Sequence, residues 1–289
     1  MEEIKTISID DKFYPQFLKE IKNPPKIIYY KGKLFPEENC FAIVGTRRCS
    51  SYGKQIAIEF AGDLCEANLT IVSGLAPGID TICHQTVVER KKRTIAVLGT
   101  GIDEKSIYPQ TNLKLARKIL EEAGAVISEY PPGTPGSKFS FPQRNRIISG
   151  LSLGTLVIEA KEKSGALITA NFAISQKRKL FAIPGPIHSL NSKGPNRLIK
   201  NGAAKLVDSS QDILKDLNLS FSKTKEAKIS GDNEQENIIL ETLKEESLHI
   251  DKIIEKTKIS AAKIAGTLAI LEIKCKVRNL GGNIYSIFK

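Results

Sequence analysis

"FAIVGTRRCSSYGKQIAIEFAGDLCEANLTIVSG", residues 41–74, decides the fold because it contains one complete strand–helix–strand unit. Its two ends, FAIV and TIVS, are short and almost wholly apolar, as is typical of strands covered on both faces. The segment between them, KQIAIEFAGDLCEAN, has the length and composition of a helix. A helix that joins two buried strands favours a parallel pair.

The same alternation continues downstream. Four further apolar runs follow, TIAVLG (94–99), AVISEY (125–130), TLVIEA (155–160) and LFAIPG (180–185), with helical segments such as TNLKLARKILEEAG between them. Six strands that alternate with helices predict a doubly wound α/β sheet. Because crossovers between parallel strands are right-handed, we expect every strand to run in the same direction.

The chain divides into parts of different character. Residues 1–36 are expected to be a lead-in segment, in which Pro24 and Pro25 exclude a continuous helix. The predicted sheet occupies residues 37–218. The polar, Lys- and Ser-rich residues that follow, 219–232, are expected to form a linker.

Residues 233–289 predict a second, smaller domain. Three helical segments occur in it, NEQENIILETLKEE, HIDKIIEKT and SAAKIAGTLAILEI, the third entered through Ser260 as N-cap. A hairpin that turns at Gly281–Gly282 follows them. Three helices and a hairpin form the winged-helix variant of the helix-turn-helix.

Charge is unevenly distributed between these parts. The net charge is +11, yet residues 232–289 carry nine basic and nine acidic side chains, so the whole excess lies in residues 1–231. A polyanion would therefore bind the larger domain. The third helix of the tail is mostly small and apolar, which favours protein contact or weak DNA contact over the reading of duplex DNA.

Other compositional features exclude whole classes of protein. No apolar run approaches the roughly 18 residues of a membrane helix, and the acidic, polar N-terminus is no secretory signal. Five cysteines without CxxC spacing predict reduced thiols in a cytoplasmic protein. With only three scattered histidines, no metal site is expected.

Glycines follow each predicted strand, for example Gly45, Gly74, Gly99 and Gly165. Since the carboxyl ends of parallel strands meet at one edge, these loops should converge on a single ligand-binding crevice. Neither the dinucleotide signature G-x-G-x-x-G nor a Walker A motif is present, which disfavours hydride transfer and P-loop hydrolysis. Instead, Arg47 and Arg48 directly follow the first strand, where guanidinium groups suit phosphate.

The loop after the fourth strand combines charge with aromatic rings in KFSFPQRNRIISGLS, residues 138–152. Fixed positive charge beside aromatic platforms is how proteins hold single-stranded nucleic acid. Either Phe139 or Phe141 would stack on a base, and the other would belong to the core. The charges come from Lys138, Arg144 and Arg146, while Asn145 would contact the strand or brace the loop.

Enzyme machinery is sparse. Asp80 and His84 lie four residues apart on one helical face and have the spacing of an acid–base pair, but we expect them to brace the helix. Glu129 and Glu159 end strands at the ligand edge, where they would orient arginines or contact a sugar hydroxyl. No set of nucleophile, base and orienting residue can be named, so we predict no enzyme.

Taken in order, several motifs resemble those of one family. They are AIVGTRRCSSYG, IVSGLAPGIDTICH, AVLGTGID, SEYPPGT, FSFPQRNRIISGLSLGTLVIEAKEKSGALITANFA and FAIPGPIHSLNSKGPNRLIKNGA. Together they closely resemble the DNA-processing protein A (DprA/Smf) family over residues 14–208, and the winged-helix tail fits many members. Many relatives carry a sterile-alpha-motif domain before the sheet, whereas about 35 residues precede the first strand here.

The resemblance implies an extended Rossmann fold that binds single-stranded DNA in a basic pocket, without a cofactor. It also implies a homodimer that protects incoming strands during natural transformation and helps to load the RecA recombinase. Carried over by motif, the DNA-binding residues would be Gly45, Thr46, Arg47, Ser73, Gly74, Lys138, Phe139, Phe141, Arg144, Asn145, Arg146, Lys163, Ser164 and Gly165.

Two other functions compete with this one. GLSLGTLVIEA loosely resembles the PGGxGTxxE signature of Rossmann phosphoribohydrolases, although the paired glycines are absent and Glu159 lies one residue too far along. Release of a base from a nucleotide would support that enzyme. A transcription regulator that works through the winged helix predicts that the tail binds duplex DNA, which its zero net charge disfavours.

Overall fold

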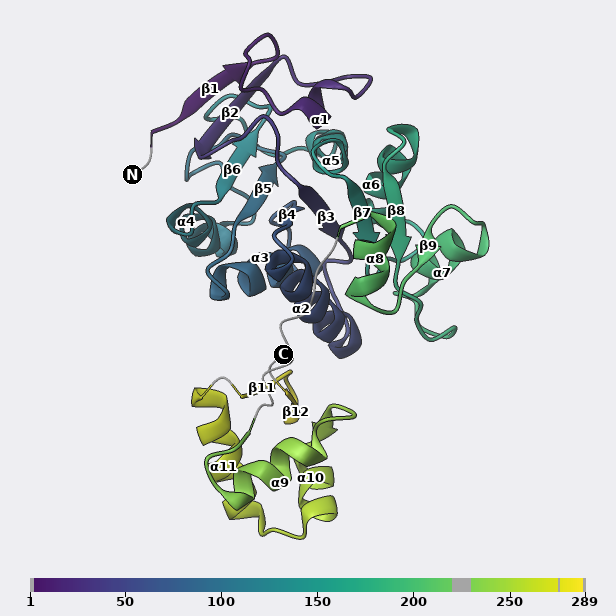
Figure 1. Cartoon of the computed structure of the whole chain (residues 1–289). Coiled ribbons are helices and arrows are strands. Elements are labelled where there is room, and N and C mark those ends of the chain that lie inside the picture. The colour runs from purple at the N-terminus through teal and green to yellow at the C-terminus, as the bar shows by residue number, and fades with distance from the viewer. Residues whose placement is uncertain (1–2, 220–229, 275, 288–289) are drawn as a thin grey trace. The chain divides into compact units, whose positions relative to one another are not determined.

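A computed structural model describes residues 3–219, 230–274 and 276–287 (Figure 1). The chain divides into two compact units, Met1–Phe221 and Ser222–Lys289. Residues 220–229, which make up most of the expected linker, lie outside the described residues.

The larger unit is built on a nine-stranded sheet with the order β1-β2-β6-β5-β4-β3-β7-β8-β9. Every pair from β6 to β9 is parallel, which confirms the predicted doubly wound sheet. The strands are β1 (Lys5–Ser8), β2 (Ile27–Gly32), β3 (Cys40–Val44), β4 (Thr70–Ser73), β5 (Thr94–Leu98), β6 (Ala125–Ser128), β7 (Gly154–Val157), β8 (Lys179–Ala182) and β9 (Lys205–Leu206).

The expectation that every strand runs in the same direction is wrong at one edge of the sheet. β2 pairs antiparallel with β6, and β1 pairs antiparallel with β2. The segment expected only as a lead-in therefore extends the sheet. Antiparallel strands at the edge of a parallel sheet are common, because they need no crossover helix.

Helices cover both faces of this sheet. The alternation within β3 shows the two layers, since Phe41 and Ile43 pack on one face while Ala42 and Val44 pack on the other. On the first face lie α2 (Ser51–Glu66), α3 (Ile79–Glu89), α4 (Leu113–Glu121) and α8 (Ser210–Asp216), and on the second lie α1 (Gln16–Lys19), α5 (Ser140–Gly150), α6 (Gly165–Ser175) and α7 (Lys193–Lys200).

The order of the strands creates a topological switch point at β3. From β3 the chain moves outward through β4, β5 and β6, and it then returns to the other side of β3 with β7 and β8. Loops that follow β3 and β7 therefore leave the sheet in opposite directions and open a crevice between them. Ligands of open α/β sheets bind in such a crevice, outside the carboxyl ends of the strands.

The smaller unit is a winged helix, as the sequence predicts. Its elements are α9 (Glu234–Thr242), β10 (Leu248–His249), α10 (Ile250–Thr257), α11 (Ala261–Ile273), β11 (Val277–Asn279) and β12 (Ile284–Ile287). Apolar side chains of all three helices form its core, including Ile239, Ile253 and Leu268. The hairpin turns at Gly281 and Gly282, both with positive φ, where glycine meets no steric penalty. Over the described residues, no helix combines the length and apolar character that a membrane span requires.

Candidate nucleic-acid interface

A pocket of about 610 Å³ opens at the switch point. We call it the switch-point pocket. Its walls are the loop after β3, the region from Lys138 to Ile148 that includes the start of α5, and lining residues within 161–169, from the loop after β7 and the first turns of α6. Ten of the fourteen predicted site residues line it: Gly45, Thr46, Arg47, Lys138, Phe141, Arg144, Asn145, Lys163, Ser164 and Gly165.

Positive charge dominates the lining of this pocket. Its basic residues are Arg47, Arg48, Lys138, Arg144, Lys161 and Lys163, and Asp80 is the one acidic residue that lines it among the described residues. The Asp80 carboxylate already accepts a hydrogen bond from the Gly74 amide at 3.0 Å. Six basic groups against one engaged carboxylate make the pocket attractive to anions.

Arg144 forms the fixed floor of the pocket. Its buried guanidinium donates to the carbonyl oxygen of Gly74 at 2.8 Å and also to that of Val97. Burial lowers the pKa of Arg144 to about 10, and the nearby Asp80 charge opposes this shift. A Cβ at Gly74 would lie 2.5 Å from a guanidinium nitrogen, so glycine is required where the arginine approaches the backbone.

Phe141 provides an aromatic wall. Its half-buried ring lies where a Cβ on Gly99 or Gly136 would stand, at 2.7 and 2.5 Å from ring atoms. The ring centroid is 5.5 Å from that of Tyr108, and the guanidinium of Arg47 lies 5.9 Å from it. A tilted aromatic contact and a cation–π contact thus meet at the same ring.

Helical phase explains which residues of α5 reach the pocket. Phe141, Arg144, Asn145 and Ile148 follow the i, i+3, i+4, i+7 spacing of one helical face, and all four line the pocket. Arg146 lies on another side of the helix. It is buried, pairs with Glu129 and donates to the carbonyl oxygen of Asn23 at 2.9 Å.

Three further predicted residues lie outside the lining. Ser73 is buried and donates to the carbonyl oxygen of Ile43 at 2.6 Å, and Gly74 lies behind Arg144. Phe139 is 72% exposed, with the amine of Lys138 5.1 Å from its ring centroid. Of the two phenylalanines, only Phe141 therefore faces the pocket.

Two basic residues of the lining, Arg48 and Lys161, are not among the fourteen predicted site residues, although the sequence already indicates that Arg48 suits phosphate. Arg48 directly follows Arg47, and Lys161 follows the fifth apolar run in the same way as Arg47 follows the first. A basic residue immediately after a strand of the switch point, the signal that indicates Arg47 and Arg48, would also have identified Lys161. Pairing of β3 with β7 is needed to apply it.

The first turn of α6 completes the pocket wall. Ser164 is the N-cap, and its hydroxyl accepts from the Ala166 amide at 3.3 Å. Asn145 joins the two walls, because its side-chain amide donates to the carbonyl oxygen of Gly165 at 3.2 Å. An added Cβ at Gly165 would meet no atom within 4 Å, so the helix start borders open space.

The candidate acid–base residues do not form a pair. His84 is buried and contacts the Thr94 hydroxyl at 2.8 Å; burial, with the Arg144 charge, lowers its pKa to about 3. Burial raises the pKa of Asp80, against the opposing Arg144 charge. His84 is therefore neutral at physiological pH and faces a different partner from Asp80.

The two glutamates at strand ends are also engaged. Glu129 pairs with Arg146. The buried Glu159 accepts from the Ser50 amide at 2.9 Å and from the Ser50 hydroxyl at 2.5 Å, at the N-terminus of α2. A carboxylate there is stabilised by the helix dipole, and Glu159 does not line the switch-point pocket.

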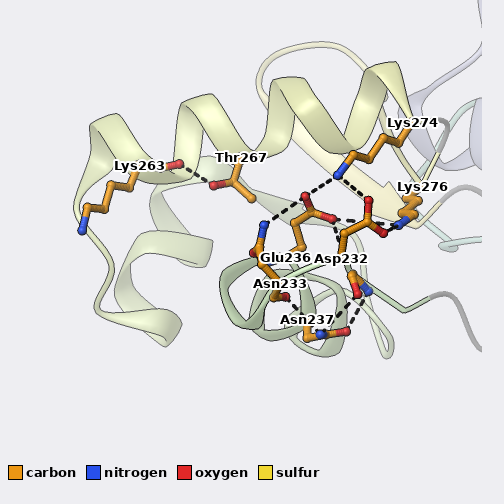
Figure 2. A network of polar contacts seen from close by, with 9 residues as sticks. Asp232, Asn233, Glu236, Asn237, Lys263, Thr267, Lys274 and Lys276 are labelled. Atoms are coloured by element: carbon orange, nitrogen blue, oxygen red, sulfur yellow. Dashed lines mark hydrogen bonds and ion pairs between the residues drawn. The ribbon is translucent and has the colours of Figure 1, made fainter.

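The winged-helix unit neutralises the basic residues that follow its third helix. Figure 2 shows Lys274 and Lys276 pointing toward Asp232 and Glu236. The amine of Lys274 lies 2.8 Å from Asp232 and 2.6 Å from Glu236, and that of Lys276 lies 2.6 Å from Asp232. Lys263 lies at the other end of α11, away from this cluster. Lysines paired in this way contribute less to DNA phosphate contact.

Comparison with known proteins identifies the family. The sequence model of DNA recombination-mediator protein A matches residues 5–218, and that of the DprA winged helix domain matches residues 223–283. The chain is 44% identical over 216 residues to the DNA processing protein DprA of Bacillus subtilis, covering 74% of this chain and 71% of that protein. It is 46% identical over 213 residues to the DprA of Streptococcus pneumoniae, covering 72% and 73%.

Solved structures agree with these sequence matches. The X-ray structure of DprA from Streptococcus pneumoniae has a TM-score of 0.67 at 41% identity, and 76% of each chain is covered. A structure of DNA processing protein A from Helicobacter pylori, described for its single-stranded DNA binding mode, has a TM-score of 0.66 at 30% identity. The match covers 75% of this chain and 98% of the Helicobacter pylori chain. The chain therefore belongs to the DNA recombination-mediator protein A (DprA/Smf) family.

Proposed function

We propose that this chain is a DNA-processing protein of natural transformation that binds single-stranded DNA in the switch-point pocket without catalysing a reaction. Family membership and the Helicobacter pylori relative, described by its single-stranded DNA binding mode, support this function. The observation that carries it is the lining itself, in which six basic residues and the Phe141 ring surround one engaged carboxylate.

The physics of the lining favours a single strand over a duplex. Arg47, Lys161 and Lys163 are exposed at the rim, where they would bind phosphates, and Phe141 offers a ring face to an unstacked base. A duplex keeps its bases stacked inside and cannot use that ring. Because phosphate contacts dominate, affinity should fall with salt and depend little on base sequence.

A non-catalytic role is supported by the state of the titratable groups. Asp80 is the one carboxylate that lines the pocket among the described residues, and it is held by the Gly74 amide. Glu159, the acid nearest to the glutamate of the phosphoribohydrolase signature, accepts hydrogen bonds from Ser50 instead. The chain should therefore release no base from a panel of nucleotides, and base release would restore the enzyme hypothesis.

Protection of incoming strands, loading of RecA and assembly as a homodimer complete the proposal. They rest on the family, whose sequence model carries the name recombination mediator. Light scattering at micromolar concentration should give the mass of a dimer. RecA filament formation on protein-coated single strands should be faster with this chain than without it, and a monomer or an unchanged filament rate would contradict these two parts.

The direct test compares single- and double-stranded oligonucleotides across a salt series by fluorescence anisotropy. Wild-type protein should prefer the single strand. The variant Arg47→Ala/Lys163→Ala should bind it more weakly. Its salt slope, the slope of log affinity against log salt concentration, should be smaller in magnitude by about 1.4, because each lost phosphate contact contributes about 0.7. Lys91→Ala/Lys118→Ala removes the same charge from exposed positions outside the lining and should bind like wild type.

Two outcomes would contradict the pocket assignment. One is an unchanged affinity of Arg47→Ala/Lys163→Ala at moderate salt. The other is an equal loss in the control variant, which would show that only the overall charge of the protein matters.

A further inference from the structure

A second basic cluster lies on α7, beside the switch-point pocket. Lys193, Arg197 and Lys200 have the i, i+4, i+7 spacing that places them on one side of the helix, and all three are exposed. We call these three residues the α7 stripe. None of them pairs with a carboxylate among the described residues, and the guanidinium of Arg197 donates to a backbone oxygen.

Other basic residues of this region form ion pairs with carboxylates. Lys179 and Lys205 share Asp216 at 2.7 and 2.9 Å, and Arg178 pairs with Glu20 at 3.2 Å. Three like charges on one side of a short helix repel one another by a few tenths of a kcal/mol per pair. An arrangement of this kind becomes favourable when an anion lies along it.

The helix that carries the stripe is fixed to the edge of the sheet. The Gly194 amide donates to the carbonyl oxygen of Ala160 at 2.8 Å. A Cβ at Gly194 would lie 2.5 Å from that oxygen, so glycine allows the close approach. The Asn196 side chain accepts from the amide of Gly185 at 3.1 Å and donates to its carbonyl oxygen at 2.9 Å. The stripe is therefore held in one position relative to the end of β7.

Two contacts connect this helix to the rim of the pocket. Arg197 donates to the carbonyl oxygen of Glu162 at 3.4 Å, and Glu162 lies between the pocket residues Lys161 and Lys163. Asn191, two residues before the stripe, donates to the carbonyl oxygen of Arg48 at 3.1 Å. The stripe thus begins where the basic rim of the pocket ends.

We propose that the α7 stripe extends the binding site, so that a single strand leaving the pocket over the Lys161–Lys163 loop continues along α7. This inference rests on the proposed function. From Lys193 to Lys200 the helix rises about 10 Å, which suits about two to three phosphates. The three side chains of the stripe offer charge and no ring, so the contact would be to phosphates and independent of sequence.

Oligonucleotides of two lengths distinguish binding at the α7 stripe from binding in the switch-point pocket. An oligothymidylate of about 6 nucleotides fills the pocket alone, whereas one of about 20 nucleotides also reaches α7. The variant Lys193→Ala/Arg197→Ala/Lys200→Ala should bind the short strand like wild type. On the long strand it should lose roughly tenfold in affinity near 0.1 M salt, with a salt slope smaller by about 2, which corresponds to three contacts.

A matched variant controls for net charge. Lys91→Ala/Lys118→Ala/Lys177→Ala removes the same three charges from exposed positions near the opposite, amino edge of the sheet, and should bind both strands like wild type. The inference is overturned if the stripe variant matches wild type on the long strand, or if it loses equally on both lengths. Failure of the proposed function has a different signature, since Arg47→Ala/Lys163→Ala would then keep full affinity for the short strand.

Discussion

At the scale of single residues, Gly165 is the most informative position of the pocket. It begins α6 directly after the Ser164 cap, and a Cβ built there meets no atom within 4 Å. A methyl group can therefore be added without disturbing the fold. It would occupy the space that a phosphate needs in order to approach the first-turn amides of the helix, which lack intrahelical partners.

We therefore expect Gly165→Ala to weaken single-strand binding roughly tenfold, the effect of losing about one charge-assisted hydrogen bond. The melting temperature should not fall, because alanine favours a helix over glycine. Gly266→Ala is the matched control: it lies within α11, its Cβ also meets open space, and it should leave binding unchanged. Full affinity of Gly165→Ala would exclude close phosphate contact at this helix.

His84 gives a second residue-scale test, this time of stability. Its pKa in the folded protein is about 3, lowered first by burial and then by the Arg144 charge. An unfolded histidine binds a proton below about pH 6.5. Between these two values the unfolded state holds one proton more than the folded state, so folding weakens as the pH falls.

From pH 6 to pH 4 this residue should cost about 1.4 kcal/mol of unfolding free energy per pH unit. The variant His84→Gln has no such group and keeps a polar side chain beside Thr94. Urea unfolding of both proteins over this range should therefore give a steeper pH dependence for wild type. If the unfolding free energies of the two proteins had the same pH dependence, His84 would take up its proton in the folded protein at the same pH as in the unfolded chain.

At the scale of elements, the sequence predicts the parts whose local pattern is strong. The six buried strands and the three helices of the tail are found where their apolar runs occur. Strands β1 and β2 escape detection because their burial alternates irregularly. β1 pairs only with β2, and the other partner of β2, β6, lies almost a hundred residues away. Short edge strands are defined by such distant pairing rather than by local propensity.

The candidate site shows the same limit. Residue types and strand ends were sufficient to collect ten lining residues, because parallel strands bring their carboxyl ends together. The sequence does not show the helical phase of α5, and so it could not assign different roles to Arg144 and Arg146. In the structure Arg144 faces the pocket, whereas Arg146 faces Glu129. The prediction that Phe139 belongs to the site is not supported by the pocket lining for a related reason, since this residue precedes the first turn of α5.

The ion-pair cluster of the winged helix makes a prediction at this scale (Figure 2). Asp232→Asn/Glu236→Gln should release Lys274 and Lys276 and raise the affinity of the full chain for duplex DNA severalfold, with a steeper salt dependence. Hydrogen bonds from these lysines lower the pKa of Asp232 to about 2. The network therefore persists down to about pH 4, and its contribution to stability is lost as the pH falls further toward 2.

A control variant adds the same charge elsewhere on this unit. Glu234→Gln/Glu245→Gln changes two exposed carboxylates that take no part in the cluster, and gel shifts with duplex DNA should match wild type. Equal gains in both variants would assign the effect to net charge. No gain in either would show that the paired lysines do not face DNA.

At the scale of the whole molecule, the uneven charge separates the roles of the two units. The excess of +11 lies in residues 1–231, and the pocket belongs to the unit Met1–Phe221. A chain that ends at Asp232 should therefore bind single strands with the same affinity and salt slope as the full chain. A loss greater than about threefold, roughly 0.6 kcal/mol, would place part of the binding surface in the winged helix.

The proposed function requires that a single strand lie in the switch-point pocket, and cross-linking tests that placement most directly. Oligothymidylate with photoreactive thymidine analogues would be irradiated on the full chain, and the modified peptides identified by mass spectrometry. We predict cross-links to Phe141 and to residues 45–48, 161 and 163–165, which line the pocket. Cross-links confined to the winged helix or to the amino edge of the sheet would contradict the account.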